Sequence, residues 1–321
     1  MPSFWVLPLG ITPGHDGNSV VFPWAVMIPF YIVDVFAVGP FTGNPLAVVI
    51  TAGRSLPDGM LQAIAQEMNY SETTFITATT PINGGYPVRI FTPEQELPFA
   101  GHPTLGTAAV IREHLQEVKS DRLLLNLQVG PIPVTFATGD DPLLWMRHNP
   151  PHFGTTLTPE DLAPVLGLGL GAFDPRFPIQ EVSTGVPFLI VPVRNLVALQ
   201  GIQWERSRYF QLIEQLEAKA ILIFCPETTA AANDLTVRVF AEAIGVVEDP
   251  ATGSANGCLA AYLVEHQYFG KPHIEIRVEQ GYAIKRPSLL CLRGNKQAGS
   301  FDINVGGRVI PIAQGELTLP V

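Results

Sequence analysis

Two short stretches of this 321-residue sequence combine small residues with side chains suited to acid/base chemistry. They are FAGHPTLGTAAVI, which contains Gly101 and His102, and DPATGSANGCLAAYL, which contains Gly253 and Ser254. Each is a small-residue turn that runs into an Ala-rich, helix-forming segment. A helix start offers unpaired N–H groups and a positive dipole end, and glycine lets a carboxylate or oxyanion approach them closely. Small residues at one helix start are more often ordinary caps, but two matched copies favour a ligand site.

Three ionisable side chains near these stretches are candidates for proton transfer. Glu72 falls between a predicted helix and the strand-like TTFIT, where an acid is usually solvated, although a dry cleft would raise its pKa and suit acid/base work. His102 titrates near neutrality, and its ordinary alternative is a capping or packing role. Asp249 is either a cap or turn residue, or a group that orients a substrate amino group or one tautomer of His102. The candidate catalytic residues are Glu72, His102 and Asp249, and the candidate substrate-binding residues are Gly101, His102, Gly253 and Ser254.

The motifs occur twice in the same order, at a period close to the size of one domain. TGNP followed by LAVVI begins at Thr42, and TGVP followed by FLIVP begins at Thr184. AGHPTLGTAAVI (100–111) aligns in the same way with TGSANGCLAAYL (252–263). A duplicated chain of this kind tends to bind its ligand between the two halves, where concave surface is available.

Two sets of elements have to position these residues. In residues 28–149 the apolar pattern predicts strands near 30–38, 46–50, 73–78, 86–92, 122–128, 131–138 and 143–147, and helices near 58–69 and 103–117. The first helix has an apolar face of Leu61, Ile64, Ala65 and Met68. In residues 150–321 it predicts strands near 179–184, 187–191, 220–224, 235–240, 273–280, 289–293, 300–304 and 307–312, and helices near 207–217 and 253–266. The turn-rich DDP (140–142) and NPP (149–151) place the junction near residue 150.

Composition limits the classes of function. The chain is 47% hydrophobic and 15% charged, which indicates a core-rich globular protein. A net charge of −10 and a pI near 5.1 argue against nucleic acid or an anionic membrane as partner, because both require a basic patch. No window reaches the ~18 consecutive apolar residues of a membrane span. The three cysteines form no C-x-x-C pair and the seven histidines are scattered, so we expect no disulfide framework, no metal site and a reducing cytoplasm.

Residues 1–27 are predicted to be an irregular extension. The first Lys or Arg of the chain is Arg54, so the basic segment of a signal peptide is missing. Prolines at positions 8, 13 and 23 would also break the helical core of such a peptide. As a hypothesis, Met27 is the natural start, shortly before the strand-like PFYIVDVFAV.

Four segments of the chain resemble the phenazine-biosynthesis isomerase (PhzF) family. They are YIVDVFAVGPFTGNPLAVV, SETTFI, RIFTPEQELPFAGHPTLGTA and EDPATGSANG, and they occur in the family's order from residue 28 onward. That family shares the diaminopimelate epimerase fold. The resemblance therefore implies an α/β (α+β) chain of two similar halves, 28–149 and 150–321, related by a pseudo-twofold axis. Each half would be a barrel-like, mostly antiparallel sheet around a central helix, with the last strand crossing back to the first half.

The resemblance also implies a role for each candidate residue. Glu72 matches the general acid/base, His102, Asp249 and Ser254 match residues around the substrate, and Gly101 and Gly253 match backbone donors for its carboxylate. The implied activity is a cofactor-independent isomerisation that moves a proton and a double bond in a small carboxylated, cyclic substrate. The implied assembly is a homodimer.

Two other functions stay open from the sequence. Related epimerases use one thiol from each half, but all three cysteines lie beyond residue 220, so two-thiol racemisation is excluded. An epimerase that uses Glu72 and another non-thiol acid is one alternative. A non-catalytic member of the family that binds small acids or a protein is the other.

Overall fold

The fold is a mixed α+β structure in which strands predominate, so the predicted class is confirmed. The computed structural model describes residues 25–51, 53–138 and 143–320. The strands up to residue 149 are β1 (Ala25–Val35), β2 (Asn44–Ile50), β3 (Thr73–Ile76), β4 (Tyr86–Phe91), β5 (Glu96–Leu97), β6 (Arg122–Leu127), β7 (Gly130–Phe136) and β8 (Leu144–Arg147). The later strands are β9 (His152–Leu157), β10 (Ile179–Ser183), β11 (Pro187–Pro192), β12 (Ala220–Cys225), β13 (Leu235–Ala241), β14 (Val246–Asp249), β15 (His273–Gln280), β16 (Ser288–Gln297), β17 (Ser300–Gly307) and β18 (Val309–Pro320).

The same order of strand pairing occurs twice along the chain. β2 pairs antiparallel with β1 and parallel with β3, β3 pairs antiparallel with β4, β4 pairs parallel with β6, and β6, β7 and β8 form an antiparallel meander. Strands β10 to β13 and β15 to β17 repeat these pairings in the same order. The repeated motifs thus correspond to repeated topology. The pseudo-twofold axis and the division at residue 150 stay predictions.

A buried helix runs through each half. α2 (Gly101–His114) packs against β1, β2 and β8, and α6 (Gly253–Glu265) packs against β16, β17 and β11. Both helices are rich in small and apolar residues on every side, and nearly all of their side chains are buried. A helix that is apolar all round belongs in a core rather than on a surface. The predicted helices near 103–117 and 253–266 are therefore confirmed, with α2 beginning two residues earlier and ending earlier than expected.

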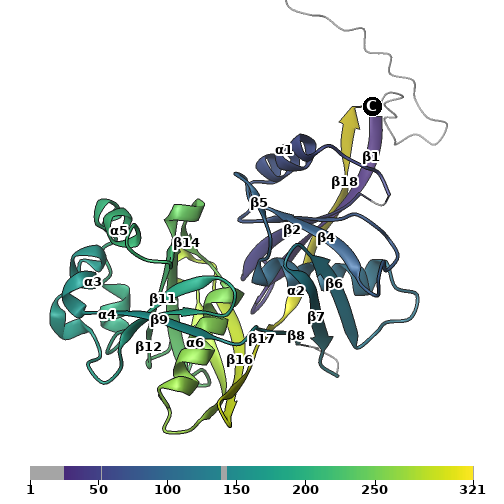
Figure 1. Ribbon diagram of the computed structural model, residues 1–321. Coiled ribbons are helices and arrows are strands. Elements are labelled where there is room, and N and C mark those ends of the chain that lie inside the picture. Colours follow the sequence, from purple (N-terminus) through teal and green to yellow (C-terminus); the bar gives the residue numbers. More distant parts are fainter. Residues whose placement is uncertain (1–24, 52, 139–142, 321) are drawn as a thin grey trace, which may run out of the picture.

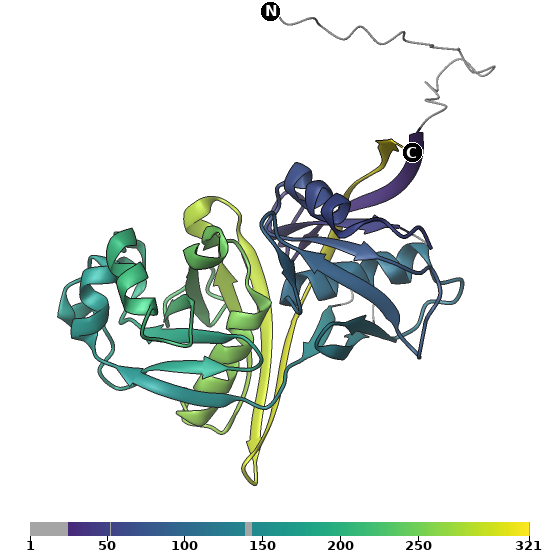
Figure 2. The same cartoon turned by 45° about the horizontal axis from the view of Figure 1, so that its top comes forward.

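The chain crosses between the two halves more than once. β8 pairs antiparallel with β17, and β18 pairs antiparallel with β1 along its whole length. Figures 1 and 2 show the yellow β18 leaving the second half and running up beside the purple β1 of the first. One buried apolar cluster includes Val33 and Leu105 as well as Leu259 and Val305, so the core is continuous across the halves.

The remaining helices lie outside the two central ones (Figure 1). α1 (Asp58–Met68) buries Leu61, Ile64 and Ala65 as predicted, against β1 to β4. α3 (Pro159–Leu166), α4 (Leu196–Gln200) and α5 (Arg206–Ile213) cover a second apolar cluster beside β11 and β12. α3, α4 and β9 were not predicted, and α5 ends sooner than the predicted helix near 207–217.

The ends of several strands differ from the prediction for a physical reason. β1 begins at Ala25, earlier than predicted, because β18 provides a partner for residues 25–29. It ends at Val35, because Phe36 adopts a left-handed φ of 58° that turns the chain. Met27, the hypothetical start, lies inside β1 opposite Thr318. Residues 1–24 and the predicted turn at 140–142 lie outside the described residues.

Two features are absent from the part of the chain that the structure describes. Within it, no helix is long and apolar enough to cross a membrane. The same residues contain no group of three His, Cys, Asp or Glu side chains that could hold a metal ion.

Candidate active site

Glu72 directly precedes β3, at the edge of the sheet where β2 and β3 begin. These strands are parallel and in register from Ala47 and Thr73, so Glu72 lies near the start of β2. A buried pair of hydroxyls, Thr74 and Thr107, 2.7 Å apart, ties β3 to the side of α2. The Glu72 side chain is only 14% exposed, and its Oε2 has no hydrogen-bond partner. It is therefore a buried acid with an unused oxygen.

His102, in the first turn of α2, faces Glu72. Its Nε2 lies 3.4 Å from Glu72 Oε2, without hydrogen-bond geometry, and it too is unpartnered. Burial lowers the pKa of His102 to about 3, so the ring is neutral and the contact is not an ion pair. The Asn44 amide nitrogen lies 3.3 Å from Nδ1. Both hydrogens of that amide point to closer acceptors, Asp249 Oδ1 and the Ala251 carbonyl, so the contact with Nδ1 leaves either neutral tautomer of the ring open.

Asn44 joins the two halves of the site. The same amide nitrogen donates to Asp249 Oδ1 and to the Ala251 carbonyl, both at 2.9 Å. The other carboxylate oxygen of Asp249 accepts from the Thr252 hydroxyl. Asn44 therefore lies between His102 and Asp249, and the proposed roles of Asp249 stay predictions. Sequence reasoning missed Asn44 as a functional residue, although it stands in the repeated TGNP motif.

Burial dominates the electrostatics of the two acids. Loss of hydration and, to a smaller extent, the nearby negative charge of Asp249 together raise the pKa of Glu72 to about 8. Burial also raises the pKa of Asp249 to about 6, although the hydrogen bonds from Thr252 and Asn44 oppose that shift. Near neutral pH Asp249 is thus mainly ionised, while Glu72 can exist in both forms. A group with that property suits general acid/base catalysis.

The two central helices meet at their first residues. α2 begins at Gly101 and α6 at Gly253, and a Cβ added to Gly101 would lie 2.9 Å from the Ser254 amide nitrogen. The two helix starts therefore lie against each other. Neither N-cap residue, Ala100 or Thr252, caps its helix with a side chain. Simple capping, the ordinary alternative for both motifs, does not account for them.

A polar hub supports the start of α6. The Gln280 amide donates to the Asp249 carbonyl and to the Thr252 hydroxyl, and its oxygen accepts from Thr252 N–H and from Asn256. These bonds fix the turn that carries Asp249. Ser254, one residue into α6, is partly buried, and its hydroxyl has no partner among the described residues.

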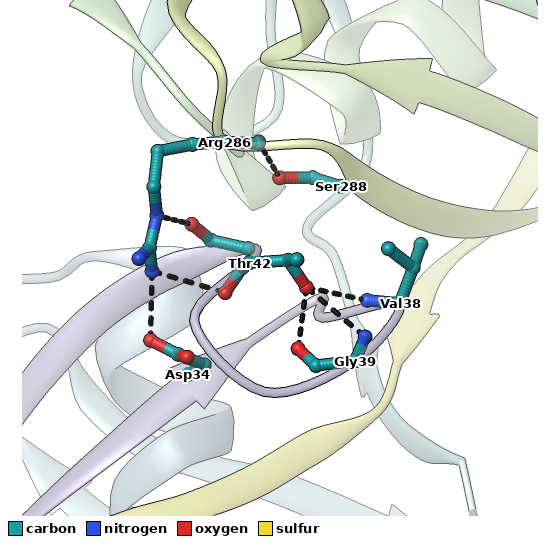
Figure 3. A network of polar contacts seen from close by, with 7 residues as sticks. Asp34, Val38, Gly39, Thr42, Arg286 and Ser288 are labelled. Carbon is teal, nitrogen blue, oxygen red and sulfur yellow. Dashed lines mark hydrogen bonds and ion pairs between the residues drawn. The ribbon is translucent and has the colours of Figure 1, made fainter.

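A contact between the halves fixes the loop before Asn44 (Figure 3). Arg286 donates through Nη2 to the buried carboxylate of Asp34 at 2.7 Å and to the Thr42 carbonyl at 3.0 Å, and through Nε to the Gly43 carbonyl at 3.0 Å. We call Arg286 with these three acceptors the latch. Because Asn44 follows Gly43 directly, the latch sets where β2 begins and hence where the Asn44 amide lies.

Comparison with known proteins places this geometry in a family. The model of the family described as phenazine biosynthesis-like protein, PhzC-PhzF, matches residues 33–315. The chain belongs to the PhzC-PhzF family. A curated relative, the trans-2,3-dihydro-3-hydroxyanthranilate isomerase of Pseudomonas fluorescens, is 34% identical over 294 residues, which cover 90% of this chain and 99% of the relative. The uncharacterized isomerase PM1503 of Pasteurella multocida is 34% identical over 293 residues, covering 91% and 94%.

Solved structures agree with the assignment to the PhzC-PhzF family. The PhzF-family phenazine biosynthesis protein of Bacillus anthracis superposes with a TM-score of 0.82 at 26% identity, covering 91% of this chain and 99% of that one. A probable proline racemase from Agrobacterium radiobacter K84 superposes with a TM-score of 0.61 at 11% identity, covering 90% and 92%. At that identity the second similarity shows the fold alone.

In this PhzC-PhzF family member, the residues singled out from the sequence lie around one point. Glu72 faces His102, and Asn44 links His102 to Asp249. Gly101 adjoins the start of α6 at Gly253 and Ser254. Their catalytic and binding roles stay predictions.

Proposed function

We propose that this isomerase moves a proton within a small carboxylated, cyclic substrate, with Glu72 as the group that carries the proton. The observation that supports this most is the pairing of a buried carboxyl of pKa about 8 with two uncapped helix starts that meet beside it. The helix starts suit an anionic group, and the carboxyl suits transfer of a proton at carbon.

Each residue has a part in the proposed reaction. The substrate carboxylate binds at the N–H groups at the starts of α2 and α6, with the Ser254 hydroxyl as a further donor. Ionised Glu72 removes a proton from one ring carbon, and the electrons of that C–H bond form a new double bond. The existing double bond shifts, and its far carbon takes the proton back from Glu72. One acid on one face of the ring suffices, and no electron acceptor is needed.

His102 and Asp249 are proposed to orient the substrate. The Nε2 atom of neutral His102 lies 3.4 Å from Glu72 Oε2, so the ring can help to keep the Glu72 carboxyl in place. Asp249 is the more acidic of the two carboxyls, so it can accept a hydrogen bond from a substrate amino group while Glu72 transfers the proton. The name of the Pseudomonas fluorescens relative, trans-2,3-dihydro-3-hydroxyanthranilate isomerase, suggests an amino-substituted ring acid as the substrate class.

The proposal is tested by incubating the protein with trans-2,3-dihydro-3-hydroxyanthranilate in deuterated water. We expect loss of the substrate and formation of a product whose double bond has shifted, with deuterium at the carbon that gains the proton to the extent that the proton on Glu72 exchanges with solvent. Glu72→Gln should lower kcat by roughly 10²–10⁴-fold or more, because glutamine keeps the size of the side chain but carries no proton. Binding of 3-hydroxyanthranilate, measured by calorimetry, should change little.

Glu67→Gln is the matched control, because Glu67 is an exposed acid on α1. It should leave both turnover and binding unchanged. If Glu72→Gln kept near-normal activity on a substrate that the parent isomerises, the mechanism would be wrong, and His102 or Asp249 would become the candidate base. Binding without any proton exchange would favour the non-catalytic alternative.

One observation keeps the epimerase alternative in view. Asp249 is a second buried acid near Glu72, and a solved PhzC-PhzF relative, PA4716 of Pseudomonas aeruginosa, is described as a predicted epimerase at 30% identity and a TM-score of 0.74. An epimerase would incorporate deuterium with inversion at a single carbon and without a shift of a double bond. Proton NMR of the product distinguishes the two outcomes.

The assembly and the location of the protein are proposals as well. We propose a homodimer, as the family resemblance implies, and a cytoplasmic location, as the absence of a C-x-x-C pair among the three cysteines suggests. Sedimentation equilibrium tests the first, and fractionation of the native cells tests the second.

A further inference from the structure

A cavity of about 860 Å³ lies apart from the candidate active site. Three of its residues and Gly306 form a row across four neighbouring strands: Arg277 on β15 is in register with Cys291 on β16, Cys291 with Gly306 on β17, and Gly306 pairs with Trp145 on β8. Residues in register share one face of a sheet. Because α6 packs against the other face of β16 and β17, the sheet separates this cavity from the interior of the second half (Figure 1).

The indole of Trp145 forms part of the cavity floor. An added Cβ at Gly306 would lie 2.5 Å from the Trp145 ring, so the ring occupies the space that the glycine leaves. The Arg293 guanidinium lies over the same ring, 4.1 Å from its centroid. Such a stacked guanidinium is held in orientation while its N–H groups stay available at the edge.

Three arginines meet at this cavity, although the whole chain carries a net charge of −10. Arg277, Arg293 and Arg308 line it together with the carboxylates of Asp234 and Glu275, and at the Cys291 thiol the negative charge of Glu275 opposes the three positive charges. Arg293 is paired with Glu275. The guanidinium of Arg277 has no ion-pair or hydrogen-bond partner among the described residues.

We propose that this cavity is a second binding site, which takes a small polyvalent oxyanion such as a di- or tricarboxylate or a phosphate ester. Guanidinium groups match carboxylate and phosphate geometry with paired N–H donors, and several of them together favour more than one negative charge. A volume of about 860 Å³ accommodates a metabolite-sized molecule. The site is independent of the proposed isomerisation, and no part of its test uses enzyme activity.

Cys291 provides a reporter inside the cavity. It is partly exposed, whereas Cys225 and Cys258 are buried. We expect anionic iodoacetate to alkylate Cys291 faster, relative to neutral iodoacetamide, than it alkylates a free thiol in solution, by roughly tenfold, because the arginines attract it. Arg277→Gln should reduce that preference several-fold. Lys271→Gln removes the same charge from an exposed turn after α6 and should leave the preference unchanged.

Ligand binding is then measured by protection of Cys291 from iodoacetamide at constant ionic strength. We expect millimolar citrate or pyrophosphate to slow the reaction in the parent and to do so much less in Arg277→Gln. Protection by citrate alone identifies a polycarboxylate site, and protection by pyrophosphate alone a phosphate-ester site. No protection by either would overturn the proposal, as would a reagent preference equal to that of a free thiol.

Two further outcomes are decisive. If alkylation slowed as the protein concentration rose, a second copy of the chain would cover the cavity and the proposal would fall. If Cys291 reacted with neither reagent, calorimetric titration of citrate and pyrophosphate into the parent and Arg277→Gln would replace the label. Equal binding of both anions to the two proteins would then overturn the proposal.

Discussion

At the scale of single residues, burial gives the acids and the histidine of the site pKa values far from their ordinary ones. Glu72 has a pKa of about 8 because it is buried beside Asp249, and His102 has a pKa of about 3 because it is buried without a charged partner. An unfolded chain would restore ordinary pKa values to both. The difference between the two states makes stability depend on pH in a direction that can be worked out.

Between pH 6.5 and 8 the folded protein is expected to lose stability because of Glu72. Its pKa is raised from 4.5 to about 8, so the folded state holds a proton that the unfolded state has released, and that stabilisation disappears as pH rises toward 8. The shifted pKa values of His102 and Asp249 change the stability mainly below pH 6.5. One group changes the free energy of unfolding by at most about 1.4 kcal/mol per pH unit. Urea unfolding of the parent and of Glu72→Gln checks this. Only the parent should lose free energy of unfolding between pH 6.5 and 8. If the free energies of the two proteins changed in parallel with pH, the raised pKa of Glu72 would be contradicted.

The ionisable residues of the site could be predicted, because few residue types can transfer a proton. The hydrogen bonds that join them could not be predicted from the sequence. His102 and Asp249 stood out as ionisable groups beside small-residue turns, and Glu72 as an acid between a predicted helix and a predicted strand. Asn44 did not, because an asparagine after a glycine reads as a turn residue, and its partner Asp249 is 205 positions away. The latch was hidden for the same reason, since Asp34 and Arg286 are 252 positions apart.

At the scale of elements, the contact between α2 and α6 depends on Gly101. A methyl group there would lie 2.9 Å from a backbone nitrogen of α6, which cannot move aside like a side chain, so we expect Gly101→Ala to separate the helix starts. Activity should fall at least tenfold and the melting temperature by several degrees. Gly59→Ala on α1 is the control: nothing lies within 4 Å of its added Cβ, and the change should stabilise by about 0.5–1 kcal/mol. Wild-type behaviour of Gly101→Ala would contradict the close approach.

The latch links another pair of elements, β1 and the turn before β16. Arg286→Lys keeps the charge but cannot reach Asp34, Thr42 and Gly43 together, so we expect a loss of about 1–3 kcal/mol in stability and a lower kcat. Asp34→Asn keeps the two carbonyl contacts of the latch and should cost less activity. Urea titrations and steady-state kinetics measure both. If Arg286→Lys lost stability but kept the parent kcat, the latch would not position Asn44.

The elements predicted best were those with strong apolar periodicity or a repeated motif, such as α1, α2 and α6. In residues 152–200, β10 and β11 were predicted, whereas β9, α3 and α4 were missed because they lie outside the repeated motifs. A signal for α3 was present: Thr158 and Asp161 form a capping box around Pro159, and Gly167 ends the helix in a left-handed conformation. Pro164 inside the helix obscured it. The short strands β5 and β14 are defined by their partners, which the sequence does not reveal.

At the scale of the whole molecule, β18 is as much a part of the first half as β1 is. We expect a chain that ends at residue 308 to lose cooperative unfolding and to aggregate, because it leaves the edge of β1 without its partner. A chain that ends at residue 317 keeps the pairing from Ile28 with Leu317 onward and should fold. Thermal unfolding and hydrogen exchange of the β1 amides distinguish the two. Equal protection of β1 in the 308-residue chain and in the full chain would contradict the expectation.

The pairing of β1 with β18 also has a consequence for the order of events during translation. A ribosome adds roughly 5–20 residues each second, so β1 emerges tens of seconds before the strand that will lie beside it. During that interval the nascent chain carries an open strand edge that other chains can pair with. Completion of the first half is therefore post-translational even though its own residues are synthesised early, and protection by chaperones matters most for the segment that is made first.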